Sequence, residues 1–194
     1  MQIATVLPNQ GPLDLIKSID LNQLTLMFTT GTSYDPSTSS NSTTAAFSLP
    51  FAFPVDITAL EQNITVGYDN QYFALLALPK APTTTDVQTR VITLTFGDVP
   101  FAVFGDQHDT FDNFIAATTM GTTQTLYLSG VANADAQTAV GLISLSGINF
   151  GVDSTIAGLE GLNAKPVSIS NLDVNHGYPS YLLITVNTDL FNPR

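Results

Sequence analysis

The 194-residue sequence contains no cysteine and no tryptophan, and only five of its residues are lysine or arginine. Without cysteine the chain has no thiol nucleophile and no cysteine-based zinc or iron–sulfur site. The five cations stand singly along the chain, at Lys17, Lys80, Arg90, Lys165 and Arg194. Nucleic-acid binding needs clustered cations that release counterions from phosphates, so we expect no nucleic-acid partner.

Charge of either sign is scarce. Only 11% of the residues are charged and 44% are hydrophobic, whereas an ordinary soluble domain holds about 25% charged residues. The net charge is −11. Neutral Thr, Ser, Asn and Gln must therefore cover the surface, and β-branched Thr fits a pleated strand better than a helix. This composition favours a β protein and suits a lumenal or extracellular setting.

Alternating apolar and polar residues predict many short strands, which is typical of an antiparallel β-sandwich. The predicted strands cover 24–28, 46–49, 57–68, 72–78, 91–96, 99–104, 125–129, 140–145, 166–169 and 181–187. Asp69-Asn70 is a turn-forming dipeptide between two of them, and the Ser/Thr-rich stretch 31–44 is predicted to be a polar loop. No strict internal repeat is visible.

One short helix is predicted over about 109–118. Phe111, Phe114 and Ile115 fall on one helical face, and Asp109 or Thr110 is the expected N-cap. The fold class is thus mainly β, an antiparallel sandwich with one short helix.

The chain divides into three parts by this pattern. Residues 1–45 supply an N-terminal strand and the polar loop, which belong to the sandwich, and residues 46–162 form its main body. Residues 163–194 hold C-terminal strands that are interpreted as the start of a following repeat. The final Leu190-Phe191-Asn192-Pro193 resembles the first strand of such a unit.

The densest group of candidate metal ligands lies just before and within the predicted helix. Asp106, His108, Asp109 and Asp112 offer the oxygen and imidazole ligands that calcium or a transition metal takes. Their spacing is not that of a calcium loop. Acidic residues are also favoured at helix starts by the helix dipole, so the ordinary alternative is helix capping.

No catalytic or cofactor-binding residues emerge from the sequence. There is no Gly-x-Ser-x-Gly elbow and no phosphate-binding glycine loop. The second histidine, His176, lies in an Asn-His-Gly-Tyr-Pro stretch that predicts a turn. A glycosidase would need only two carboxylates, which any acidic chain has. We therefore expect a protein that is not an enzyme and has no cofactor.

Two stretches fit the N-glycosylation rule. Asn41-Ser42-Thr43 lies in the predicted polar loop, and Asn63-Ile64-Thr65 lies in a predicted strand. Asn41 is the better candidate because a polar loop is open to the transferase. Both are predicted glycosylation sites for a chain in the secretory pathway.

Three segments resemble a fungal family known only as domain-of-unknown-function family 3712. They are Phe53-Pro54-Val55-Asp56-Ile57-Thr58, Leu126-Tyr127-Leu128-Ser129-Gly130-Val131-Ala132 and Gly158-Leu159-Glu160-Gly161-Leu162. The resemblance covers roughly residues 50–162. It implies a late-embryogenesis-abundant-like β-sandwich of the second subgroup, often in tandem behind one membrane helix in the parent protein. It also implies a vacuolar-lumen or extracellular location, and it supplies no catalytic residues.

Three functions remain open. The first is a structural or interaction domain with a protein or cell-wall partner. The second is lipid binding, with an acyl chain between strands rich in apolar residues such as Phe47, Phe73, Phe101 and Phe104; core packing is the ordinary alternative. The third is self-assembly through the uncharged segments 125–129 and 181–186.

Overall fold

The alternation in the sequence produces the predicted mainly antiparallel β fold with one short helix. The computed structural model describes residues 15–48, 54–162, 168–177 and 179–189. Its strands are β1 (Ile16–Asn22), β2 (Thr25–Met27), β3 (Ser37–Phe47), β4 (Asp56–Tyr68), β5 (Gln71–Pro82), β6 (Thr84–Asp86), β7 (Val91–Val103), β8 (Thr123–Thr138), β9 (Gly141–Ala157), β10 (Ser168–Gly177) and β11 (Leu182–Asp189). The helical segments are α1 (His108–Met120) and the 3-10 turn η1 (Glu160–Leu162).

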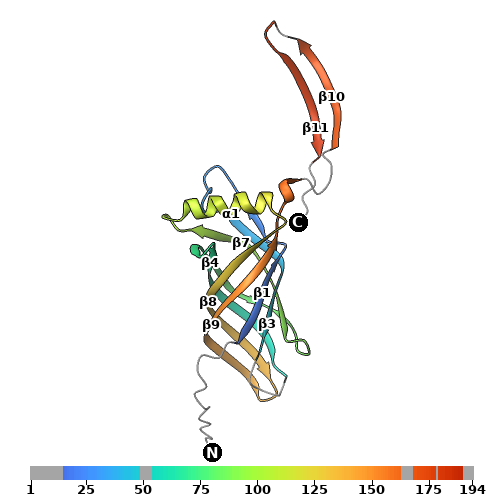
Figure 1. The fold of residues 1–194 in the computed structure, drawn as a ribbon. Coiled ribbons are helices and arrows are strands. Elements are labelled where there is room, and N and C mark those ends of the chain that lie inside the picture. Colours follow the sequence, from blue (N-terminus) through green and yellow to red (C-terminus); the bar gives the residue numbers. More distant parts are fainter. Residues whose placement is uncertain (1–14, 49–53, 163–167, 178, 190–194) are drawn as a thin grey trace, which may run out of the picture.

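Nine of these strands form one rolled sheet (Figure 1). Its order is β1-β3-β7-β5-β4-β8-β9, with β2 also paired to β3 and β6 to β7, and every pairing is antiparallel. The roll is nearly closed because β1 comes to lie beside β9. Within the described residues no ladder joins these two strands. We call the line between them the seam.

Helix α1 lies across one end of the roll (Figure 1). Two phenylalanines of the helix are buried against the core. Phe111 and Phe114 are each 2% exposed, and the ring of Phe114 lies 5.4 Å from that of Phe73. Phe101 joins the same cluster at 6.1 Å from Phe111. Offset aromatic packing of this kind adds to the hydrophobic gain of burial. The predicted helix and its apolar face are confirmed.

The predicted polar loop 31–44 is wrong over much of its length, because residues from Ser37 onward form strand β3. Hydroxyl side chains face the interior there: Thr38, Ser40 and Thr43 are at most 3% exposed. Thr38 Oγ1 donates to the Thr25 carbonyl at 3.0 Å, and Ser40 Oγ donates to the Asn22 carbonyl at 2.8 Å. Buried hydroxyls are tolerated when they are hydrogen-bonded, which is how a Ser/Thr run can be a core strand.

The strands β8 and β9 are longer than the short segments predicted at 125–129 and 140–145. They span 16 and 17 residues and pair along nearly their whole length. On its other side β8 pairs with β4, and the two backbones come close at Gly130. A Cβ built on Gly130 would lie 2.0 Å from the Asn63 carbonyl oxygen, so only glycine fits.

Local predictions fared differently at the two turns and the helix start. Asp69 and Asn70 have φ of 48° and 61°, which confirms the tight turn between β4 and β5. The predicted cap is wrong: Gln107 is the N-cap without a side-chain cap bond, and Thr110 Oγ1 donates to Gln107 Oε1 at 3.0 Å. Residue 176 is not in the turn predicted around it, because it pairs with Leu183; the chain reverses direction just after it, between Gly177 and Leu182.

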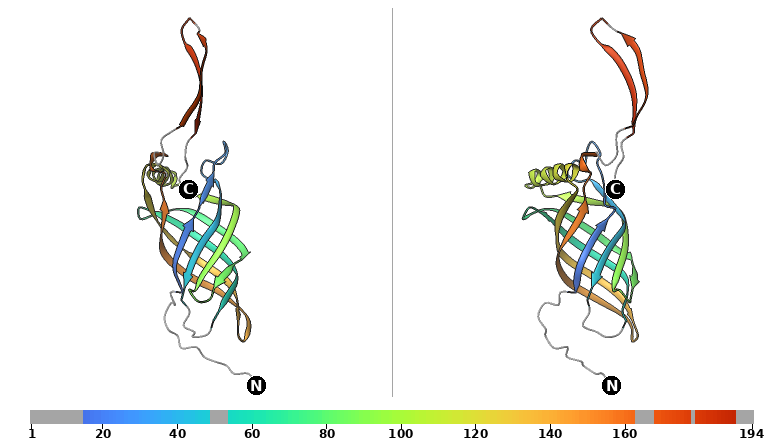
Figure 2. Two further views of the ribbon diagram at one scale, coloured as in Figure 1. Left: turned by 90° about the vertical axis from the view of Figure 1, so that its right-hand side faces the viewer. Right: turned by 45° about the vertical axis from the view of Figure 1, so that its right-hand side comes forward.

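Strands β10 and β11 form a separate two-stranded sheet that stands away from the roll in every view (Figures 1 and 2). They cover most of the C-terminal part that the sequence separates at residue 163. Pro50, Phe51 and Phe53, part of the resemblance to the fungal family, lie outside the described residues, as does the segment Leu190–Pro193.

Candidate functional site

The four candidate metal ligands do not converge. Asp106, Asp109 and Asp112 are exposed, and the described part of the chain contains no group of three or more His, Asp or Glu side chains arranged to hold a metal ion. His108 instead stacks on the ring of Tyr34, with centroids 3.6 Å apart and planes 1° apart. The acidic stretch is therefore part of the start of α1 and not a metal centre in this arrangement.

Tyr34 was not predicted from the sequence as a site residue. It connects the 29–36 segment to α1 through its contacts with His108 and Asp112. Its hydroxyl donates to Asp112 Oδ2 at 3.2 Å. Desolvation of the half-buried ring, followed by that hydrogen bond to Asp112, raises the pKa of Tyr34 above its usual value. Nothing in the sequence spacing links residue 34 to residues 108 and 112, so only the folded chain reveals this contact.

Both predicted glycosylation asparagines are exposed on strands. Asn41 lies on β3 and Asn63 on β4, and the side chains of both are open to solvent. The expected difference between them, a loop against a strand, is absent. Asn41 differs in another way, since it is one of the residues that line the hollow described below.

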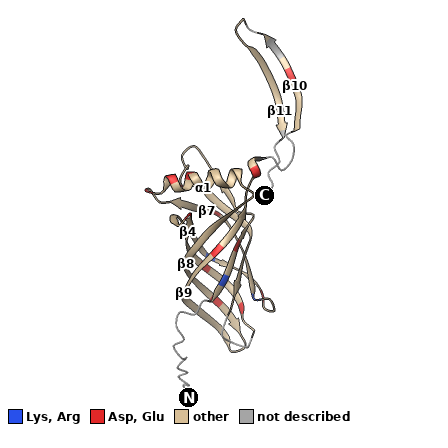
Figure 3. Ribbon diagram, viewed as in Figure 1, with Lys and Arg blue, Asp and Glu red and all other residues tan. Residues whose placement is uncertain are grey.

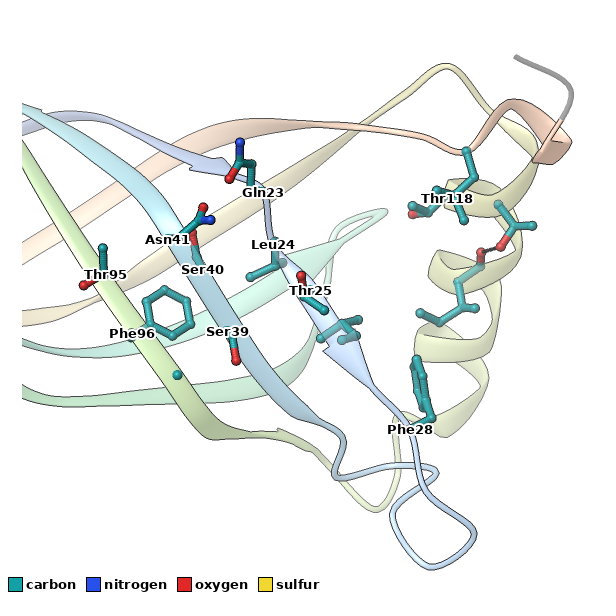
Figure 4. A pocket seen from close by; sticks show the side chains of 15 residues that line it. Gln23, Leu24, Thr25, Phe28, Ser39, Ser40, Asn41, Thr95, Phe96 and Thr118 are labelled. Carbon is teal, nitrogen blue, oxygen red and sulfur yellow. Dashed lines mark hydrogen bonds between the residues drawn. The ribbon is translucent and has the colours of Figure 1, made fainter. Parts of the chain in front are cut away.

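A large hollow lies between α1 and β2, at the end of the roll where the helix sits (Figure 4). We call it the α1–β2 groove; its volume is about 850 Å³, within the range of sites that enclose a ligand. Its apolar lining is Leu24, Leu26, Phe28, Phe96, Ile115 and Leu159. The remaining lining residues are neutral polar or glycine, and none is charged.

Thr118 gives the groove a polar group without a partner. Its side chain is on α1 and faces the groove, opposite Leu24 and Thr25 (Figure 4). The residue is 5% exposed, yet its Oγ1 makes no hydrogen bond in the described structure. Leaving a buried hydroxyl unpaired costs about 1–3 kcal/mol, so this position is a local weak point in the packing of α1.

The hairpin β10–β11 is the second candidate site, because its apolar side chains are exposed. Val174 pairs with Ile184 and Ile169 with Thr188, and residues two apart on a strand share a face. One face of the hairpin therefore carries only apolar side chains apart from Thr188, and we call it the apolar hairpin face: Ile169, Leu172, Val174, Leu182, Ile184 and Val186. Ile169 and Leu172 are each 65% exposed and Ile184 is 50% exposed.

The sequence of β10 repeats that of β1, a signal that the search for strict repeats missed. Residues 16–22 are Ile-Lys-Ser-Ile-Asp-Leu-Asn and residues 169–175 are Ile-Ser-Asn-Leu-Asp-Val-Asn. Both strands pair antiparallel with the next long strand of the chain, and both carry a register irregularity after the first isoleucine. The inward-facing positions of β1 correspond to the apolar hairpin face.

One small pocket lies in the interior of the described roll. This apolar pocket, next to Ile57, Leu60 and Ala132, has a volume of about 30 Å³, enough for about one water molecule. Phe73 and Phe101 are buried in the core, as the packing alternative expects. The acyl-chain hypothesis stays a prediction.

Comparisons with known proteins leave the family undetermined. No family model matches the chain, and no curated protein matches it. A solved structure described as a protein from Archaeoglobus fulgidus aligns with 73% of this chain and 96% of its own, at 10% identity and a TM-score of 0.30. That similarity is too low to support an argument. In the described residues, no helix has the length and hydropathy of a membrane span.

Proposed function

We propose that this protein is a non-catalytic structural or interaction domain, lumenal or extracellular, that docks a partner protein through the apolar hairpin face. The observation that carries the proposal is the exposure of six large apolar side chains on a two-stranded sheet that, within the described residues, pairs with no other strand. An isolated two-stranded hairpin is marginally stable in water. Contiguous exposed apolar surface of this kind marks protein interfaces.

The rest of the surface fits the same role. Charge is thinly spread over the roll (Figure 3), so neutral hydroxyl and amide groups dominate what a partner would meet. The acidic net charge and the two exposed sequons suit a secreted or vacuolar chain. Membership of the fungal family that residues 50–162 resemble belongs to this proposal, together with the membrane-anchored parent that the resemblance implies.

A photo-crosslinker placed on each face of β11 tests the docking surface. Ile184 is on the apolar hairpin face, and its neighbour Thr185 points to the opposite face. We expect benzoyl-phenylalanine at position 184 to form a protein adduct in fungal membrane and wall fractions, identified by mass spectrometry. The same group at position 185 is the matched control. Equal labelling at both positions, or none at either, contradicts the proposal.

Enzymatic removal of N-glycans tests the location. Chain secreted from a eukaryotic host should lose mass on treatment, and Asn41→Gln and Asn63→Gln assign the loss to a site. If glycan removal leaves the mass of the unmodified secreted chain unchanged, the glycoprotein part of the proposal is contradicted.

A further inference from the structure

The α1–β2 groove and the hairpin β10–β11 lie at the same end of the molecule. The α1–β2 groove opens beside α1, and the hairpin leaves the roll from the α1–η1 end (Figures 1 and 2). The groove also lies at one end of the seam. Strand β2 pairs with β3 along one edge, and no ladder of the described sheet joins its other edge to β9. An extended strand laid in the groove would continue the sheet beyond β2, a common way for one chain to bind another.

The hairpin has the sequence to occupy such a position. Its strand β10 repeats β1, the strand that forms one side of the seam. In β1 the corresponding residues Ile16, Ile19 and Leu21 are buried against the core, at 6%, 1% and 5% exposure. The same pattern of apolar residues in β10 is therefore suited to cover an apolar wall made by this fold.

Charge also permits two copies to meet here. The chain carries a net charge of −11, so two copies repel one another over most of their surfaces. The groove lining has no charged residue, and the only charged residues of β10 and β11 are Asp173 and Asp189. The groove and the hairpin are thus neutral surfaces on which association avoids that repulsion.

We infer that the partner of the apolar hairpin face is a second copy of this chain, whose α1–β2 groove receives the hairpin. This deepens the proposed function and rests on it. Side chains of the apolar hairpin face cover Leu26, Phe28 and Ile115. Because both features lie at one end, two copies exchange hairpins reciprocally and form a closed dimer with two identical junctions.

Sedimentation velocity over a concentration series tests the dimer with bacterially made chain. We expect a monomer–dimer equilibrium. Ile184→Asp in the hairpin and Leu26→Asp in the groove should each raise the dimer dissociation constant by about tenfold or more. Val140→Asp is the control, because Val140 is 89% exposed on the β8–β9 turn, away from both surfaces.

Mixing the two variants distinguishes this arrangement from others. The Ile184→Asp chain keeps its groove and the Leu26→Asp chain keeps its hairpin, so their mixture should form a dimer with one intact junction. Each variant alone should stay monomeric at the same concentration. If instead Leu26→Asp dimerises like the unmodified chain, the hairpins stack on each other and the inference is overturned.

Engineered cysteines give a second measurement that does not depend on a destabilising charge. The chain has no cysteine, so Thr119→Cys in the groove and Leu172→Cys in the hairpin are unique thiols. Mild oxidation of an equal mixture should give the mixed disulfide above all. An equal mixture of the Leu172→Cys and Val140→Cys chains should not form the mixed disulfide as the main product.

The two proposals fail separately. A monomeric chain that gives no mixed disulfide, but is crosslinked from position 184 to another protein, overturns the second-copy inference and keeps the docking function. A chain with neither dimer nor crosslink overturns both.

Discussion

Strands β1 and β10 place similar seven-residue segments, identical at three positions, in two different surroundings. In β1 the apolar residues face the core, and Ile19 is 1% exposed. In β10 the matching Leu172 is 65% exposed, although its strand also pairs with an antiparallel partner. Local sequence therefore specifies the strand and which side chains share a face, and only the neighbouring layer decides whether that face is buried.

The pairing partner accounts for part of this difference. Strand β3 lies between β1 and β7, so β1 belongs to a sheet that curls round and encloses its own apolar face. Strand β11 pairs only with β10 in the described chain, so the hairpin has no second layer. Both faces of a two-stranded ribbon meet solvent until something else covers one of them.

The sharpest way to break the comparison is to truncate the two matching residues. Ile19→Ala should lower the free energy of unfolding by about 2–5 kcal/mol, because it leaves a cavity in the core. Leu172→Ala should change it by less than about 0.5 kcal/mol, as for an exposed position. Urea denaturation at concentrations where the chain is monomeric measures both, and equal losses would show that β10 is covered by the chain itself.

Much of the fold follows from the sequence because alternation and turn chemistry are local. The β4–β5 hairpin was predictable, since Asp69-Asn70 tolerates positive φ between two alternating runs. Strand β3 was not, because its interior residues are Ser and Thr. Their burial depends on accepting carbonyls at Thr25 and Asn22, which lie elsewhere in the chain.

The candidate site shows the same division between local and long-range information. The uncharged, strand-prone segment 181–186 was a candidate for self-assembly, and the structure leaves the apolar side chains of its strand exposed. The other such segment, 125–129, lies in β8 between β4 and β9. The α1–β2 groove joins residues from five separate segments, so no sequence window contains it.

A second comparison uses glycines in the two regions. Gly130→Ala in β8 should destabilise the chain by about 1–3 kcal/mol or more, because the new Cβ meets the Asn63 carbonyl at 2.0 Å. Gly177→Ala in β10 has open space within 4 Å and should have little effect. Thermal and urea unfolding of the two variants provide the test. A tolerated Gly130→Ala would mean that β4 and β8 are farther apart than described.

The smallest expected effect concerns the ion pair between Lys80 and Asp135 on the roll. The strands of the hairpin contain no lysine or arginine and so cannot form such a pair. Lys80 Nζ lies 2.5 Å from Asp135 Oδ2, and Ser144 Oγ donates to Asp135 Oδ1 at 2.8 Å. These hydrogen bonds, that from Lys80 foremost, hold the pKa of Asp135 below its ordinary value. A lowered folded-state pKa stabilises the fold above the unfolded pKa of about 4, and the gain is lost as pH falls through the folded value.

Lys80→Gln should therefore raise the pKa of Asp135 toward its ordinary value, measured by NMR titration of the carboxyl carbon. The variant should be slightly less stable than the unmodified chain near neutral pH. That difference should shrink toward zero once Asp135 is protonated in both proteins. Lys17→Gln is the matched control, because Lys17 is an exposed lysine on β1 of the same sheet and is not the cation bound to Asp135. A stability gap for Lys80→Gln that persists at low pH would show that the aliphatic stem of Lys80, and not its charge, provides the stabilisation.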